Sequence, residues 1–198
     1  DDLFLLRAGI ITRQQWLNLL AKTITRYLRT PGRFHQTVAA SSFDAWTRFY
    51  KQDENTLNAV VSYYLKGALV ALCMDLTLRK LSDHEASLDV LMQQLWQRYL
   101  SGQPGVTERV IRDLLLDMVG PAMQEPLTQW LHSTNELPVL ALLSEFGVKV
   151  SVTADTGKVN CGLGVSIKPC ADGGVTLSLV TRGSAAEQAG LSAGDAVV

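Results

Sequence analysis

The feature that most constrains the fold is a change in hydrophobic periodicity about three quarters of the way along the chain. Before it, apolar side chains recur at three- and four-residue spacing, which is typical of amphipathic helices. After it, Val148, Val150 and Val152 alternate with polar residues, which is typical of a β-strand. We therefore predict a mainly α chain with a helical region at residues 1–147 and a β-rich module at residues 148–198.

Helix boundaries can be placed in the first part. Thr12 and Gln15 have the spacing of a capping box, and Pro31-Gly32 would end the helix that they begin. Ser82 and Glu85 have the same spacing and should open a second helix. Further helical segments are expected at residues 43–50, 58–80, 107–119, 123–131 and 137–146.

The longest apolar stretch covers residues 59–78 and contains Lys66 and Asp75. A membrane span needs ~20 residues with few or no charges. We therefore predict that this stretch is a buried core helix and that the chain has no membrane partner.

The second part contains two further strand-like runs, at residues 163–168 and 175–181, with Asp172-Gly173-Gly174 as a hairpin turn between them. A short helix is expected at 184–188, and a last strand begins at Val197. So few strands leave sheet edges unpaired. We therefore expect that the chain has been cut at its C-terminus, and its start at Asp1 suggests missing sequence upstream as well.

Composition excludes some classes of function. The net charge is −1 and hydrophobic residues make up 47% of the chain, so the sequence is that of a folded protein without a field that would attract nucleic acid. The three cysteines do not form a disulfide framework. Cys161 and Cys170 could pair across a hairpin, but free buried thiols are the preferred interpretation, which favours a reducing, cytoplasmic location.

Common catalytic patterns are absent from the sequence. His35, His84 and His132 are isolated from one another, and neither a paired-histidine helix nor Cys-x-x-Cys occurs, so we predict no metal site. A Gly-x-Ser-x-Gly elbow and a P-loop are also lacking. The glycines near Cys161 open a strand, so a dinucleotide-binding loop is a weak interpretation.

Two segments could carry chemistry. Tyr63, Tyr64 and Lys66 lie in an otherwise apolar helical stretch, where burial without polar partners would be costly. Either their polar atoms reach water at the end of the helix, or a tyrosine faces a cleft and donates a hydrogen bond to developing negative charge. Spacing alone favours the first alternative.

The second segment is Gly162-Leu163-Gly164-Val165, whose backbone N–H groups could converge on a carboxylate. A plain β-turn is the alternative. With the downstream run Ser184-x-Ala186-x-x-Ala189-Gly190-Leu191, followed by Gly194-Asp195, this loop resembles that of a PDZ domain. Ala185 stands where proline is common in bacterial PDZ domains. The resemblance implies that Leu163, Gly164 and Val165 bind a peptide carboxylate, although the chain stops before the helix that would form the second wall of the groove.

Nearly the whole chain resembles the glycyl aminopeptidase family of zinc peptidases, in which a thermolysin-like catalytic domain precedes a PDZ domain. The matching segments are Asp1-Asp2-Leu3-Phe4-Leu5-Leu6-Arg7-Ala8-Gly9, Ser42-Phe43-Asp44-Ala45-Trp46, Tyr63-Tyr64-Leu65-Lys66-Gly67-Ala68-Leu69 and Leu76-Thr77-Leu78-Arg79. The resemblance implies that residues 1–147 are a helical C-terminal subdomain and residues 148–198 a truncated PDZ domain.

The family's zinc-binding His-Glu-x-x-His helix and downstream glutamate are not in this sequence. The resemblance therefore implies zinc in the parent protein and no cofactor in this fragment. Related zinc aminopeptidases have a Tyr-x-Lys-Gly segment whose tyrosine stabilises the tetrahedral intermediate. Tyr64 matches that position and Tyr63 is the alternative.

In the implied reaction, zinc polarises the peptide carbonyl and activates water, the glutamate takes the proton, and Tyr64 donates to the oxyanion. The substrates would be peptides with a small N-terminal residue such as glycine.

Three hypotheses follow. The first is an enzyme fragment that is inactive alone because its zinc site lies upstream. The second is a non-enzymatic PDZ module that binds a peptide C-terminus. The third is a purely structural helical domain.

Overall fold

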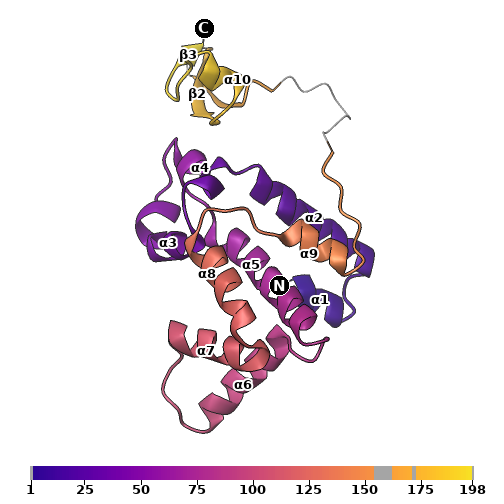
Figure 1. The fold of residues 1–198 in the computed structure, drawn as a ribbon. Coiled ribbons are helices and arrows are strands. Elements are labelled where there is room, and N and C mark those ends of the chain that lie inside the picture. Colours follow the sequence, from indigo (N-terminus) through magenta and orange to yellow (C-terminus); the bar gives the residue numbers. More distant parts are fainter. Residues whose placement is uncertain (1, 154–161, 171–172, 198) are drawn as a thin grey trace. The chain divides into compact units, whose positions relative to one another are not determined.

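A computed structural model describes residues 2–153, 162–170 and 173–197, and it shows a mainly helical chain with a small antiparallel sheet near its C-terminal end (Figure 1). The chain forms two compact units. One contains Asp1–Gln36, Ala40–Lys66 and Val159–Val198, and the other contains Thr37–Ala39 and Gly67–Lys158. Mainly helical architecture is confirmed. The domain boundary at residue 147 and the PDZ identity of the C-terminal module stay predictions.

The helices and strands follow one another in this order: α1 (Asp2–Arg7), α2 (Arg13–Leu28), η1 (Pro31–Phe34), α3 (Val38–Phe43), the π-helix η2 (Ala45–Phe49), α4 (Thr56–Ala59), α5 (Tyr63–Leu81), α6 (Leu88–Leu100), α7 (Glu108–Val119), η3 (Pro121–Met123), α8 (Gln124–His132), α9 (Val139–Glu145), β1 (Val165–Pro169), β2 (Val175–Val180), α10 (Ala185–Gln188) and β3 (Ala196–Val197).

The start of α2 is set by the predicted capping box. The Thr12 hydroxyl accepts from the Gln15 N–H at 3.2 Å, and the Thr12 N–H donates to the Gln15 side chain at 2.8 Å. These two bonds satisfy N–H groups that have no partner within the helix. The helix ends at Leu28, shortly before Pro31 begins the 3-10 helix η1.

The single helix predicted at residues 58–80 is wrong at its start. α4 ends at Ala59, the chain is extended at Val60, and α5 begins only at Tyr63. The backbone of Val61 is held by side chains instead of by helical bonds: its N–H donates to the Gln36 side chain at 3.2 Å and its carbonyl accepts from the Ser41 hydroxyl. This places Tyr63 in the first turn of a helix rather than in a helix interior.

Gly32 packs directly against the extended segment. A Cβ atom at this position would overlap the backbone of Val60. Only glycine allows two backbones to approach this closely. The start of α5 is therefore positioned by a residue that precedes it by about thirty positions, and Ser62 caps the helix by accepting from the Leu65 N–H at 3.2 Å.

The central part of α5 is apolar and partly enclosed, and its buried apolar side chains are Leu69, Val70, Cys73, Leu76 and Leu78. By length and composition alone, Thr56–Leu81 is the one stretch of the described residues that could cross a membrane, and 39% of its most apolar window is buried. The buried side chains show that part of this helix lies in the core, and burial of the whole stretch stays a prediction. The lack of a membrane partner stays a prediction.

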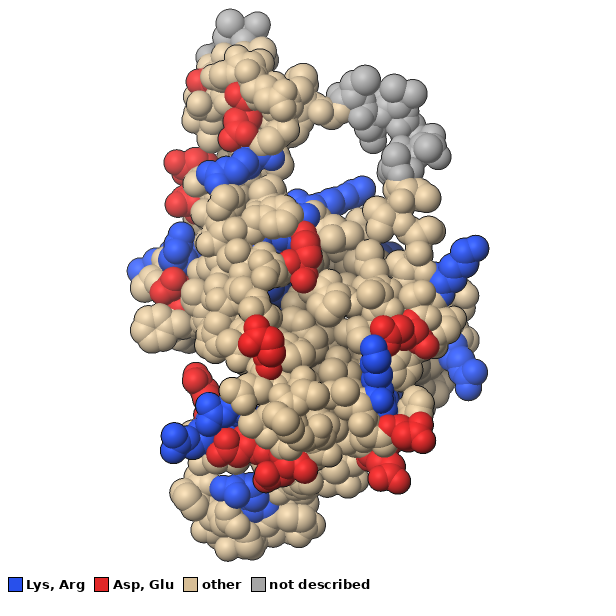
Figure 2. All heavy atoms as spheres, viewed as in Figure 1, with Lys and Arg blue, Asp and Glu red and all other residues tan. Residues whose placement is uncertain are grey.

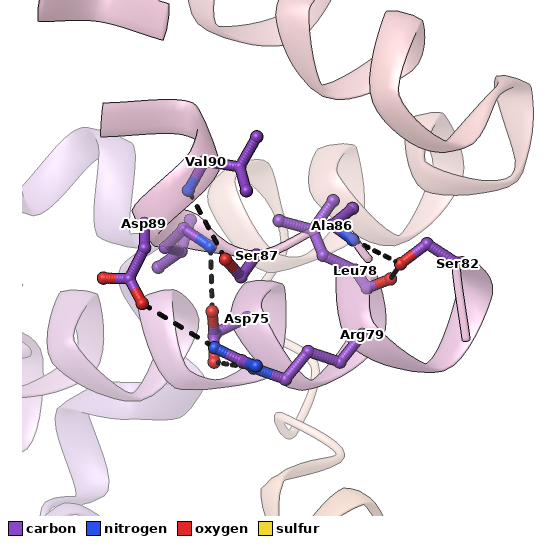
Figure 3. Close-up of polar contacts among 9 residues, drawn as sticks. Asp75, Leu78, Arg79, Ser82, Ala86, Ser87, Asp89 and Val90 are labelled. Carbon is purple, nitrogen blue, oxygen red and sulfur yellow. Dashed lines mark hydrogen bonds and ion pairs between the residues drawn. The ribbon is translucent and has the colours of Figure 1, made fainter. Parts of the chain in front are cut away.

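The turn after α5 differs from the predicted capping box of Ser82 and Glu85. α5 continues to Leu81, and the Ser82 hydroxyl instead donates to the Leu78 carbonyl at 2.8 Å and accepts from the Ala86 N–H at 2.7 Å (Figure 3). Asp83 and His84 adopt positive φ angles of 51° and 73°, which interrupts the helical path.

The next helix begins six residues after Ser82, at Leu88, with Ser87 as its N-cap. Asp75 of α5 joins the two helices (Figure 3). One of its carboxylate oxygens accepts from the Leu88 N–H at 2.8 Å, and the other accepts from Arg79 Nε at 2.8 Å. Arg79 also lies 3.8 Å from the carboxylate of Asp89. The carboxylate of Asp75 thus caps α6 from a neighbouring helix.

The helices α7, α8 and α9 agree with the sequence predictions. α7 ends at Gly120, whose φ is 75°, and α9 is followed by Gly147, whose φ is 79°. The strand expected from Val148, Val150 and Val152 is wrong, because residues 148–153 form neither helix nor strand and the side chain of Val152 is exposed. Alternation alone does not make a strand without a partner for its backbone.

The C-terminal module contains an antiparallel sheet in the order β1-β2-β3. Val165 pairs with Val180 and Pro169 with Val175, with a bulge between Ser166 and Ile167. Leu177 of β2 and Ala186 of α10 are its buried apolar residues in the described part of the chain; Ser184 caps α10. The predicted strands and short helix are confirmed. Asp172 of the predicted turn lies outside the described residues.

Within the same compact unit, the Asn58 side chain bonds to the strand end of this module. Asn58 Nδ2 donates to the Val180 carbonyl at 2.8 Å, and Asn58 Oδ1 accepts from the Arg182 N–H at 2.8 Å. Arg182 Nη1 also lies 2.8 Å from His35 Nε2. Asn58 is buried, and both bonds are partly buried.

Candidate functional site

A cluster of aromatic side chains, which we call the tyrosine cluster, lies where η2 meets the first turn of α5. Its members are Trp46, Phe49, Tyr50, Tyr63 and Tyr64, and all five belong to the first compact unit. Two neighbouring segments therefore present three phenols together.

The hydroxyl of Tyr50 is the centre of the hydrogen-bonding pattern. It lies 3.1 Å from the Tyr63 hydroxyl and 3.1 Å from the Tyr64 hydroxyl. A phenol has one proton and can both donate and accept. The three side chains therefore form a short hydrogen-bonded chain with Tyr50 in the middle.

Ring packing supports this arrangement. The Tyr63 and Tyr64 rings have centroids 4.2 Å apart, and Phe49 meets the Tyr63 ring edge-on at 5.4 Å. Trp46 lies 5.1 Å from the Tyr50 ring. Such contacts stabilise aromatic pairs beyond simple burial, so the hydroxyls are held by their rings as well as by their hydrogen bonds.

Exposure distinguishes the members of the cluster. Tyr64 is 62% exposed and Tyr50 50%, whereas Tyr63 is half-buried. Tyr64 therefore reaches an open surface at the start of a helix, which fits both sequence interpretations of this segment. Its assignment as the functional tyrosine stays a prediction. Lys66 does not reach water and is fully buried.

The hydrogen bonds shift the pKa values of the two terminal phenols, Tyr63 and Tyr64, in opposite directions. The pKa of Tyr64 is lowered from its ordinary value, chiefly by its hydrogen bond with Tyr50 and then by Tyr63. The pKa of Tyr63 is raised, again chiefly by its hydrogen bond with Tyr50. A bond that stabilises the ionised form lowers a pKa, and one that is lost on ionisation raises it.

Two aromatic side chains that precede Tyr50 in the chain are strongly exposed. Trp46 is 79% exposed and Phe43 is 91% exposed. The sequence pattern suggested ordinary helical spacing for this segment, but the structure divides it between α3 and the π-helix η2. Trp46 contacts the Tyr50 ring, so an exposed ring borders the phenols of the tyrosine cluster.

The second candidate site is the loop before β1. The Leu163 carbonyl accepts from the Ala186 N–H at 3.0 Å, and the Gly164 carbonyl accepts from the Thr181 N–H at 2.7 Å. Gly164 has φ of 78°, and a Cβ there would overlap the Ser184 side chain. Leu163 is exposed, Val165 is the first residue of β1, and β1 is an edge strand of the described sheet.

Other candidate groups are not brought together. Within residues 2–153, 162–170 and 173–197, no group of three or more His, Cys, Asp or Glu side chains could hold a metal ion. His84 meets the Phe146 ring edge-on at 5.7 Å. Cys73 and Cys170 are free thiols, and burial raises the pKa of Cys73 to about 12. Cys161, the suggested partner of Cys170, lies outside the described residues.

Charge is mixed on the molecular surface. The face drawn in Figure 2 carries basic and acidic side chains among each other. This matches the net charge of −1. The expectation that nucleic acid is not a partner stays a prediction.

The part of the site that sequence reasoning missed is Tyr50. It precedes Tyr64 by fourteen positions across an irregular segment, and neither helical nor strand periodicity connects residues over such a distance. The only available signal was the density of aromatic residues at 43–50.

Comparisons with known proteins point in one direction. The family model for M61 glycyl aminopeptidases matches residues 1–70, which include the whole tyrosine cluster. A crystal structure of an aminopeptidase N family protein from Idiomarina loihiensis is 36% identical, with a TM-score of 0.83. The alignment covers 98% of this chain and 35% of that protein.

The chain thus spans about a third of the length of the structure that it matches. Comparison with curated proteins gives no match. The family-model match and the structural similarity together support a part of a peptidase.

Proposed function

We propose that this chain forms one wall of the active site of a zinc aminopeptidase that removes small N-terminal residues such as glycine, and that Tyr64 donates a hydrogen bond to the oxyanion. The observation that carries the proposal is the exposed Tyr64 hydroxyl in the first turn of α5, inside the segment that matches the M61 family model. Tyr63 is the alternative donor, and its half-buried position favours it less.

The position of Tyr64 suits this role for two physical reasons. The N-terminal end of a helix carries partial positive charge, which stabilises negative charge that develops nearby. A neutral phenol can donate to an oxygen that becomes negatively charged in the transition state. The donor therefore acts where the reacting carbonyl gains charge, without itself changing charge.

The described residues do not fit a zinc site, because none of their acidic, histidine or cysteine side chains gather into a ligand set. We assign no step to a metal here. The contribution of this chain is hydrogen-bond donation, shape and exclusion of water on one side of the substrate. Peptides are the proposed partner, and a cytoplasmic location is part of the same proposal.

The test uses the full-length protein with a glycyl substrate. Tyr64→Phe should lower kcat by ~10²–10³, since this is the typical cost of losing one oxyanion donor, while KM changes little. Tyr99→Phe is the matched control, because Tyr99 is 70% exposed on α6 and lies outside the cluster. Full activity of the Tyr64 variant would overturn the proposal.

A second function is favoured by the loop at Leu163 and Gly164. Its edge strand β1 could pair with an added peptide strand, which is how PDZ domains bind C-termini. Titration with one peptide as free acid and as amide tests this function. Binding that requires the free carboxylate supports it, and equal affinity for both forms contradicts it.

A further inference from the structure

The three phenols of the tyrosine cluster contain three protons but make two hydrogen bonds through Tyr50. Because the Tyr50 hydroxyl has one proton and two lone pairs, it either donates to one neighbour and accepts from the other, or accepts from both. One of the three protons is therefore not used in these two bonds, and it belongs to Tyr64, Tyr63 or Tyr50.

The surroundings of the three phenols select among these arrangements. Tyr64 is the most exposed of the three at 62%, Tyr50 is 50% exposed, and Tyr63 is half-buried beside the rings of Phe49 and Tyr64. An unused donor costs little where it can reach water or a ligand and more where it is enclosed. The favoured order runs from Tyr63 through Tyr50 to Tyr64.

Tyr50 is held in the position that this order requires. It follows the π-helix η2, where its N–H donates to the Ala45 carbonyl at 2.9 Å. Trp46 packs on its ring, and Phe49 meets the ring edge-on at 5.3 Å. A tyrosine has few rotatable bonds, so these contacts restrict where its hydroxyl can lie.

We propose that Tyr50 is a positioning residue: it accepts from Tyr63, donates to Tyr64, and so leaves the Tyr64 O–H directed outward for the carbonyl oxygen of a peptide substrate. This inference rests on the function proposed for Tyr64. The opposite pKa shifts of Tyr63 and Tyr64 have the signs that this order produces. Hydrogen bonds in a chain also strengthen one another.

The first test is a double-mutant cycle in the full-length protein. Tyr50→Phe should lower kcat roughly tenfold, the usual scale for one neutral hydrogen bond, with KM nearly unchanged. In a Tyr64→Phe background the same substitution should cost nothing further, because it acts through the Tyr64 hydroxyl. An equal loss in both backgrounds would overturn the proposal.

The second test needs no activity. With ring-labelled tyrosine, NMR titration of the same protein should show the pKa of Tyr64 move up toward its ordinary value in the Tyr50→Phe variant. Tyr99→Phe, which leaves the cluster intact, should leave that titration unchanged. No change in the Tyr50 variant would mean that Tyr50 does not act on Tyr64, and the inference would fail.

The outcomes separate the two proposals. If Tyr64→Phe keeps full activity, the function proposed for Tyr64 fails and the substrate role of Tyr50 falls with it. If Tyr64→Phe loses activity while Tyr50→Phe changes neither rate nor titration, only the positioning role fails.

Discussion

The first turn of α5 and its last turns use polar side chains in opposite ways. In the first turn, the Tyr64 hydroxyl is exposed and belongs to a chain of phenols with a proton to spare. Further along, both carboxylate oxygens of Asp75 are occupied, one by the Leu88 N–H and one by Arg79 (Figure 3). The difference indicates where to look for chemistry. An exposed hydroxyl with an unused proton can serve a substrate, whereas a carboxylate with both oxygens bonded inside the protein serves the fold.

The largest expected effect comes from a substitution that displaces the backbone before the first turn of α5 and leaves every tyrosine in place. In Gly32→Ala the new Cβ meets the Val60 backbone, so we expect a loss of about 3 kcal/mol in the free energy of unfolding, the upper range for overpacking. Chemical denaturation measures it. Gly105→Ala is the control, because a Cβ atom there would meet nothing within 4 Å. An equal loss of stability in the two variants would contradict the close contact between Gly32 and Val60.

Loss of Asp75 should lower the stability of the fold and leave catalysis unchanged. Asp75→Ala removes the acceptor of the Leu88 N–H and of Arg79 and should cost about 2 kcal/mol in unfolding free energy. The kcat of the folded protein should stay unchanged. Asp113→Ala, which loses only an exposed ion pair with Arg112, should fall within about 0.5 kcal/mol of wild type. A large fall in kcat for the Asp75 variant would remove the contrast.

The helix cap beside the tyrosines gives a smaller effect. Ser62→Ala deletes the acceptor of the Leu65 N–H and should cost about 1 kcal/mol in unfolding free energy. Thr107→Ala at the start of α7 is the matched comparison, since Thr107 makes no side-chain capping bond and its loss should cost less. Thermal melting measures both variants, and equal shifts in melting temperature would show that the Ser62 bond contributes nothing to stability.

The mildest expected effect is on pH dependence. Tyr64 must be protonated to donate, and its pKa lies below the ordinary value of 10.0 because of Tyr50. Activity should therefore fall as pH rises through that lowered pKa. Tyr50→Phe should move the alkaline limb of kcat to higher pH. A limb that stays in place would indicate that another group titrates there.

Sequence patterns were sufficient where bonding is local. Thr12 and Gln15 lie three residues apart and form the capping box that their spacing predicts. Gly120 and Gly147 follow the ends of helices with positive φ angles, and this too is a local effect because glycine alone adopts positive φ at little cost. Segments of this kind account for most of the helical boundaries that were correctly predicted.

Patterns failed where a distant residue decides the local conformation. Ser82 and Glu85 also have capping-box spacing, but the cap of α6 comes from Ser87 and from Asp75 on the preceding helix. The break before α5 depends on Gln36, which accepts from the Val61 N–H, and on Ser41, which donates to the Val61 carbonyl. In the site, Tyr64 could be identified by its sequence neighbours, whereas Tyr50 could not.

The Asn58 carboxamide has a consequence for the C-terminal module. The Val180 carbonyl and the Arg182 N–H flank Thr181 and both bond to Asn58, while the Thr181 N–H bonds to Gly164. In an extended chain, the carbonyl of the residue before a given position and the N–H of the residue after it point to the same side, where the next strand of a sheet would bind them. A single side chain therefore imitates the peptide group of an adjoining strand and closes this end of β2 against unwanted pairing with other chains, which is a form of protection from aggregation.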